Sequence, residues 1–235
     1  MEKEEFNLNI EEMIKAGLHF GHRTSKIHPK MMPYLQGVRN TVHIIDVEKT
    51  REKLSDALKF IRQLSAENKI LLLVGTKIQV KDLVKETALS CQLPYVDERW
   101  IGGTFTNFNI LRKRVDYLKE LEQKLGTPEI IEKYTKKEKA GMEEESRELK
   151  LKFGGIRNLE KFPDAIFVFD MKKDDLAIKE AKAKGVKVIA ISDTNCDPTL
   201  ADYPIPANDD AISSLKYIAE KVKEVILKAK SKPTK

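Results

Sequence analysis

KILLLVGT (69–76) is the stretch that decides the fold class of this sequence. It is short, almost continuously apolar, and ends in a glycine and two polar residues. Four further runs share this character: VHIID (42–46), LPYVD (93–97), DAIFVFD (164–170) and KVIAISD (187–193). Strands that are buried on both faces of a parallel sheet have such continuous apolar runs, whereas half-exposed strands alternate. The five runs therefore predict a parallel sheet of five strands.

Amphipathic stretches alternate with these runs and predict helices. They cover residues 48–66, 78–91, 174–184 and about 209–229. Leu89, Leu176 and Ile212 are among the side chains that we expect to face the core. An alternation of strands and helices predicts an α/β fold in which helices cover both faces of one parallel sheet.

The alternation breaks between LPYVD and DAIFVFD, because roughly 65 residues separate them and an ordinary crossover is much shorter. Within this insertion, residues 107–125 and 135–153 have the pattern of two long, charged helices. Thr135 and Glu138 have the spacing of a capping box at the start of the second helix. We expect an antiparallel, coiled-coil-like helical hairpin, with a flexible charged insertion as the alternative. The expected units are 1–104 (first part of the α/β domain, with a basic N-terminal extension), 105–153 (hairpin), 154–230 (second part) and 231–235 (basic tail).

Composition limits the function classes. The 235 residues have a formal charge of +6, which is compatible with a polyanionic partner without requiring one. Cys91 and Cys196 form no CxxC pair, and MEKEEFNLNI resembles neither a secretory signal nor a transit peptide. The apolar runs are too short to span a bilayer. We therefore expect a protein of a reducing compartment that makes no membrane contact.

The segment from Met13 to Ile45 contains no Asp or Glu, although the chain has 37 acidic residues. It holds all four histidines and several lysines and arginines. The local field is expected to be strongly positive, which favours contact with phosphate. The candidate RNA-binding residues here are Arg23, Lys26, Lys30, Arg39 and Asn40.

A second segment, from Arg99 to Val115, also lacks acidic residues. Its sequence RWIGGTFTNFNILRKRV combines basic charge, a Gly-Gly pair that exposes backbone amides, and short polar side chains, a combination that suits an RNA backbone. Trp100 and Phe105 could offer flat faces to RNA or could be core residues, and both readings stay open. We expect the two acid-free segments to lie together in space and to face RNA. The candidates in the second segment are Arg99, Gly102, Gly103, Thr106, Asn107, Arg112 and Arg114.

His19 and His22 have the spacing of half a zinc site. No cysteine pair or HExxH arrangement completes it, so the two residues are only weak metal candidates. The simpler interpretation is that these rings donate hydrogen bonds to phosphate or support the surrounding turns.

An enzyme is the main alternative to an RNA-binding protein. Asp46, Asp97, Asp170 and Asp193 end four of the apolar runs, where α/β enzymes place their sites, and could hold Mg²⁺ for phosphoryl transfer. Each Asp could instead cap the helix that follows. Because the sequence has no GxGxxG after the first run, no complete P-loop and no nucleophile elbow, the enzyme reading is the less favoured one.

Nine motifs are spread over nearly the whole chain: AGLHFGH (16–22), HPKMMPY (28–34), RNTVHIIDVEKT (39–50), LLVGTK (72–77), RWIGGTFTN (99–107), GGI (154–156), FPDAIFVFD (162–170), AISDTNCDP (190–198) and IPANDDA (205–211). Together they resemble the ribosomal protein S2 family of the small subunit, in its bacterial branch. They occur in the order and spacing typical of that family. His28 stands where the family usually has Asn, and Ile101 where it usually has Leu.

The resemblance implies a three-layer flavodoxin-like sandwich with five parallel strands in the order 2-1-3-4-5 and a protruding helical hairpin. It implies a structural protein of translation that binds small-subunit ribosomal RNA, without catalysis or cofactor, in the cytoplasm or in the plastid stroma. It also implies neighbouring small-subunit proteins as partners, including the large multi-OB-fold protein that recruits messenger RNA.

Overall fold

A computed structural model describes residues 6–128 and 132–231. Its centre is a parallel sheet of five strands in the order β5-β4-β6-β7-β8, which is the predicted order 2-1-3-4-5. The strands are β4 (Leu71–Val74), β5 (Tyr95–Val96), β6 (Ala165–Val168), β7 (Lys187–Ser192) and β8 (Tyr203–Pro206). The predicted five-stranded parallel sheet is confirmed, but one of its strands is not the one expected.

VHIID (42–46) does not belong to this sheet, contrary to the prediction. β3 (Val42–Ile45) pairs antiparallel with β1 (Phe20–Arg23) and β2 (Leu35–Arg39) in a separate three-stranded sheet. His43 is buried between half-buried neighbours. This alternation is typical of a strand with one exposed face, and four residues are too few to reveal it in the sequence.

The fifth parallel strand is β8, which the sequence analysis missed. Pro204 and Pro206 occupy two of its four positions. Proline cannot donate to a strand ladder, so a run with two prolines does not look like a strand. β8 pairs with β7 alone, and an edge of the sheet is where proline is tolerated.

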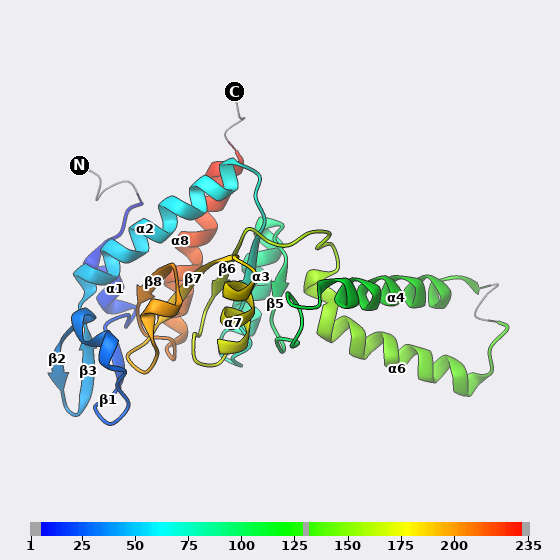
Figure 1. Cartoon of the computed structure of the whole chain (residues 1–235), viewed down its shortest axis with the longest axis horizontal. Helices are drawn as coiled ribbons and strands as arrows, with labels where there is room; N and C mark the ends of the chain where they lie inside the picture. The colour runs from blue at the N-terminus through cyan, green and yellow to red at the C-terminus, as the bar shows by residue number, and fades with distance from the viewer. Residues whose placement is uncertain (1–5, 129–131, 232–235) are drawn as a thin grey trace.

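Helices cover both faces of the sheet, as predicted (Figure 1). Along β6, Phe167 packs into one hydrophobic core, while Ile166 and Val168 pack into the other. The first core also takes the apolar stripes of α2 (Val47–Ala66), α3 (Lys81–Cys91) and α8 (Ile212–Lys230). The second takes α7 (Asp175–Ala183) and parts of α4 (Phe108–Gly126) and α6 (Lys136–Phe153). The chain is therefore a three-layer sandwich.

Three side chains that we expected to face the core are exposed: Leu89, Leu176 and Ile212. In α3 the buried positions are Val84, Thr87, Ala88 and Cys91, which recur at helical spacing. Leu89 lies outside that stripe, because a short helix buries only a narrow face.

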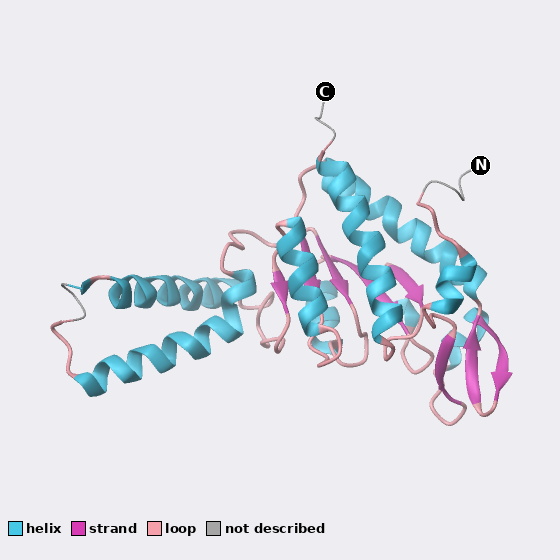
Figure 2. Cartoon of the chain, turned by 180° about the vertical axis from the view of Figure 1, so that it is seen from behind, coloured by secondary structure: helices cyan, strands magenta, loops and turns pink. Residues whose placement is uncertain are grey.

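α4 and α6 lie side by side and extend away from the sheet in both views (Figures 1 and 2). The hydroxyl of Tyr117 in α4 donates to Glu145 in α6 at 3.0 Å. α6 begins with the predicted capping box, in which Thr135 and Glu138 satisfy each other's backbone N–H groups. In the part of the chain that the structure describes, no helix is both long and apolar enough to cross a membrane.

Candidate nucleic-acid interface

The first acid-free segment forms the three-stranded sheet and the loops beside it. Arg23 and Arg39 end β1 and β2, Lys26 lies in the loop after β1, and all three side chains are exposed. Asn40 and Thr41 have positive φ angles of 48° and 64°, as a tight two-residue hairpin turn requires. Among the described residues, the three basic side chains make no ion pair or side-chain hydrogen bond. Their charge is available to a ligand.

Lys30 differs from these three residues because it is already paired. Its Nζ lies 2.7 Å from Asp197 Oδ2 and 2.9 Å from Thr199 Oγ1, and the contact lowers the pKa of Asp197 to about 2. His28 caps the short helix η2 (Pro29–Tyr34), its Nδ1 accepting from the backbone N–H of Lys30 at 3.3 Å. Lys30 thus ties η2 to the loop after β7 and is a weaker RNA candidate than Arg23.

In the second acid-free segment, backbone N–H groups donate hydrogen bonds to a carboxylate of the protein itself. Glu180 of α7 is 6% exposed, and its oxygens accept from the N–H groups of Gly103 at 2.7 Å, Phe105 at 2.8 Å and Thr106 at 3.2 Å. Burial alone would raise the pKa of Glu180, but these hydrogen bonds outweigh it and the pKa lies below its ordinary value. The expectation that these amides are free for phosphate is therefore wrong.

The aromatic residues of this segment belong to the core. Trp100 and Phe105 are buried, and their rings meet edge to face with centroids 5.0 Å apart. Of the two readings that the sequence left open, the core reading is confirmed.

The basic residues of the second segment divide into two kinds. Arg112 is half-buried and its Nη1 donates to the carbonyl oxygen of Glu160 at 2.6 Å. Arg99 and Arg114 are exposed and, within the described residues, form no ion pair. Gly102, Thr106 and Asn107 are also exposed, although the backbone N–H of Thr106 donates a hydrogen bond to Glu180.

The two acid-free segments do not lie together, contrary to expectation. The second segment follows β5, at one edge of the parallel sheet, whereas the three-stranded sheet lies beyond β8, at the other edge (Figures 1 and 2). The first segment reaches as far as the loop after β7, and because neighbouring strands are about 4.8 Å apart, the three steps from β7 to β5 correspond to roughly 14 Å. They form two separate basic surfaces.

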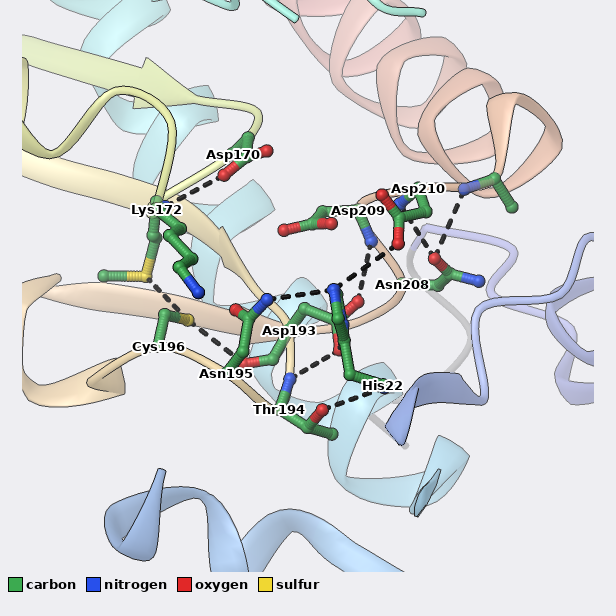
Figure 3. A network of polar contacts seen from close by, with 12 residues as sticks. His22, Asp170, Lys172, Asp193, Thr194, Asn195, Cys196, Asn208, Asp209 and Asp210 are labelled. Carbon is green, nitrogen blue, oxygen red and sulfur yellow. Dashed lines mark hydrogen bonds and ion pairs between the residues drawn. The ribbon is translucent and has the colours of Figure 1, made fainter. Parts of the chain in front are cut away.

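A polar cluster lies where β7 and β8 end (Figure 3). His22 Nδ1 is 3.2 Å from Asp193 Oδ1, and His22 Nε2 is 3.5 Å from Asp210 Oδ2 and 2.9 Å from Asn195 Nδ2. The hydrogen bond with Asp193 raises the pKa of His22. With Asp209, these groups bring one ring nitrogen and three carboxylate oxygens within 4.8 Å of one another, a donor set that a divalent cation can accept.

Only one of the two weak metal candidates belongs to this cluster. Among the described residues, the cluster includes His22 but not His19, whose ring packs on Phe20 with centroids 4.0 Å apart. In this cluster, His22 stands with Asp193, Asp209 and Asp210 rather than with His19.

Lys77 is the cation inside the cluster. Its Nζ lies 3.1 Å from Asp170, 3.1 Å from Asp209 and 2.7 Å from Asp210. Burial alone would lower the pKa of Lys77, but the three carboxylates outweigh it and raise the pKa, so the ammonium stays charged. Lys77 thus compensates part of the acidic charge at this edge of the sheet.

The four strand-end aspartates have different surroundings. Asp46 caps α2, accepting from the N–H of Glu48 at 3.0 Å, as its capping reading predicted. Asp170 and Asp193 border the polar cluster, and Asp193 accepts from backbone amides rather than capping a helix. Asp209 and Asp210 were missed, because the strand before them was missed. Had β8 been recognised, they would have stood at the same carboxyl edge as the others.

The matches to known proteins agree with this architecture. The family model "Ribosomal protein S2" matches residues 13–229. The chain belongs to the ribosomal protein S2 family. It is 43% identical to the small ribosomal subunit protein uS2 of Dictyoglomus thermophilum, over 94% of this chain and 89% of that protein. It is also 43% identical to uS2 of Coprothermobacter proteolyticus, over 95% of this chain and 83% of that protein.

Membership of the ribosomal protein S2 family gives the chain a structural role in the small ribosomal subunit. The resemblance seen in the sequence is confirmed. The family is one of ribosomal proteins rather than enzymes, which agrees with the prediction that the chain is not an enzyme. The clustered aspartates are therefore part of the architecture, and the magnesium-dependent phosphoryl-transfer alternative is set aside.

Proposed function

We propose that this chain binds small-subunit ribosomal RNA through two separate basic surfaces, in the cytoplasmic ribosome. The first surface consists of Arg23, Lys26, Arg39 and Asn40, and the second of Arg99 and Arg114 with the exposed polar residues beside them. The observation that carries the proposal is that the basic side chains of both surfaces are exposed and, among the described residues, have no ion pair.

Arginine without an internal partner is suited to phosphate, because its planar guanidinium can donate two parallel hydrogen bonds. Acidic residues are absent from both segments, which leaves each segment itself with an excess of positive charge. Lys30 and Arg112 complete the two surfaces from positions where each already has a contact within the protein. Gly102 and Gly103 shape the second surface through the backbone.

The test is to titrate a transcript of the small-subunit RNA with the full chain at several salt concentrations. Each phosphate contact contributes about 0.7 to 0.9 to the slope of log affinity against log salt. Paired alanine variants at Arg23 and Arg39, or at Arg99 and Arg114, should lower both the affinity and the slope. Alanine at Lys216 and Lys228 is the control of equal charge: both are exposed lysines of α8 that belong to neither surface, and each pairs with a glutamate of its own helix.

Equal losses in the control and in the arginine pairs would overturn the proposal. Lys230 and Lys232 are less suitable controls than Lys216 and Lys228. Lys230 donates to the carbonyl oxygen of Cys91 at 2.6 Å, so its removal also disturbs α3, and Lys232 lies outside the described residues.

We also propose that the chain contacts neighbouring small-subunit proteins, among them the large multi-OB-fold protein that recruits messenger RNA. Family membership supports this partner. The test compares binding of purified multi-OB-fold protein to small subunits assembled with and without this chain. Equal binding to both would overturn this part of the proposal.

A further inference from the structure

Glu180 stands out among the buried polar residues because its partners come from a distant part of the chain. It lies in the middle of α7, and its carboxylate meets the backbone of residues 103–106, about 75 positions earlier in the sequence. The Gly103 and Phe105 amides approach different oxygens of the carboxylate, and the Thr106 amide shares an oxygen with that of Phe105. The carboxylate therefore fills a concave group of N–H donors of the kind that binds phosphate in other proteins.

The loop that Glu180 holds leads directly into α4. The carbonyl oxygen of Gly103 accepts from the N–H of Asn107, and Asn107 precedes the first residue of α4. The side chain of Asn107 makes no capping hydrogen bond, and the first turn of α4 contains no acidic residue. A helix start without a cap or a negative charge is usually less stable. Glu180 supplies the missing negative charge from another helix.

We propose that Glu180 is a positioning residue of the RNA interface. This inference rests on the proposed function. Glu180 does not touch RNA. Its carboxylate occupies the place that a phosphate would take in the loop, and it thereby fixes the start of α4. Arg112 and Arg114 lie in the first two turns of α4, and Arg99 lies just before the loop, so their positions depend on this contact.

Charge and positioning predict opposite changes in RNA affinity when Glu180 is neutralised. Glu180 is an anion close to a surface that binds a polyanion, so by charge alone its neutralisation would strengthen RNA binding. If Glu180 acts by positioning, its neutralisation weakens RNA binding instead. In Glu180→Gln, one acceptor oxygen is replaced by an NH₂ group, which would face N–H donors that it cannot satisfy.

The experiment uses the full chain and a transcript of small-subunit RNA, titrated at several salt concentrations. We expect Glu180→Gln to bind on the order of tenfold more weakly, the change that about 1.4 kcal/mol produces. The salt slope should fall by about one, because at least one phosphate contact is lost. Asp175→Asn is the matched control, since it removes the same charge from the same helix at an exposed position that contacts Lys179 rather than the loop. Unchanged or tighter binding by Glu180→Gln would overturn the inference.

A second variant separates positioning from a general loss of structure. Glu180→Ala leaves room for a small carboxylate among the same N–H donors. At constant ionic strength, acetate in place of chloride should restore RNA affinity in Glu180→Ala and leave the wild type unchanged. Absence of rescue in a variant with a native circular dichroism spectrum argues against positioning. If Glu180→Ala does not fold, Glu180→Gln alone decides.

A further measurement distinguishes failure of this inference from failure of the proposed function. If the wild type itself does not bind the transcript, the RNA-binding function is wrong. Hydrogen exchange of the amides of residues 103–106 then still tests the structural step. Faster exchange in Glu180→Gln than in Asp175→Asn supports the anchoring of the loop, and equal exchange rejects it.

Discussion

Two buried carboxylates near α7 respond to burial in opposite ways. Glu180 has three backbone donors and keeps a pKa below its ordinary value. The side chain of Asp174 accepts from the N–H and the hydroxyl of Thr76, and burial raises its pKa to about 6. For Glu180 the hydrogen bonds outweigh desolvation, whereas for Asp174 desolvation and the nearby charge of Asp170 outweigh the hydrogen bonds from Thr76.

The raised pKa of Asp174 predicts a pH effect on stability. Below about pH 4 Asp174 is protonated in both the folded and the unfolded chain, and its favourable contribution to the free energy of unfolding is fully present. As the pH rises through about 6 this contribution is lost, and the free energy of unfolding falls by up to about 3 kcal/mol. Asp174→Asn cannot ionise, so denaturant unfolding should show its stability rising relative to wild type between pH 4 and pH 7. Asp175→Asn should show no such trend, and parallel pH profiles for Asp174→Asn and wild type would contradict the assignment.

The partner of the Gly-Gly loop could not be predicted from the sequence. The segment suggested an anion, and the structure does place an anion there. That anion is the side chain of Glu180, which looks in the sequence like any other glutamate of an amphipathic helix. Long-range pairing of this kind depends on the topology that brings α7 beside the loop, and no local pattern records it.

Among the elements, the sequence could predict the strands in the middle of the sheet but not those at its margin. β4, β6 and β7 are buried on both faces, so their apolar runs are continuous and easily recognised. β8 lies at an edge and tolerates prolines, and β3 belongs to a different sheet. Both errors concern strands with fewer burial constraints, where the sequence pattern is weakest.

At the junction between β5 and the short helix η3 (Gly154–Ile156), alanine substitution of two adjacent glycines should have very different effects on stability. A Cβ on Gly155 would overlap the carbonyl oxygen of Tyr95 and come within 2.8 Å of its ring, whereas a Cβ on Gly154 would meet nothing within 4 Å. Gly155→Ala should therefore lower the free energy of unfolding by about 1–3 kcal/mol. Gly154→Ala should change it little. Thermal unfolding of the two variants is the measurement. Equal midpoints would show that the backbone at this junction shifts to make room for the added Cβ.

At the scale of the whole molecule, the two basic surfaces lie at opposite ends of the parallel sheet. The sheet between the two surfaces fixes their separation, so RNA bound as proposed would be contacted at two distinct places. The α4–α6 pair extends the molecule further beyond the second surface (Figure 1).

This separation predicts that the two surfaces contribute independently to RNA affinity. Arg39→Ala and Arg114→Ala should each weaken binding, and the double variant should show the product of the two fold-changes, because distant sites without shared partners are additive. Titrations of the small-subunit transcript with the two single variants and the double variant provide the test. A double variant no weaker than the worse single variant would indicate that both arginines act in one contact.

The prolines of β8 have a consequence for the protein before it is assembled. An unpaired sheet edge can serve as a template for a strand of another molecule, which leads to aggregation. Here one edge strand carries Pro204 and Pro206, and the other, β5, is only two residues long. Both edges of the parallel sheet are therefore poor templates, and this sheet resists the addition of a strand from another molecule.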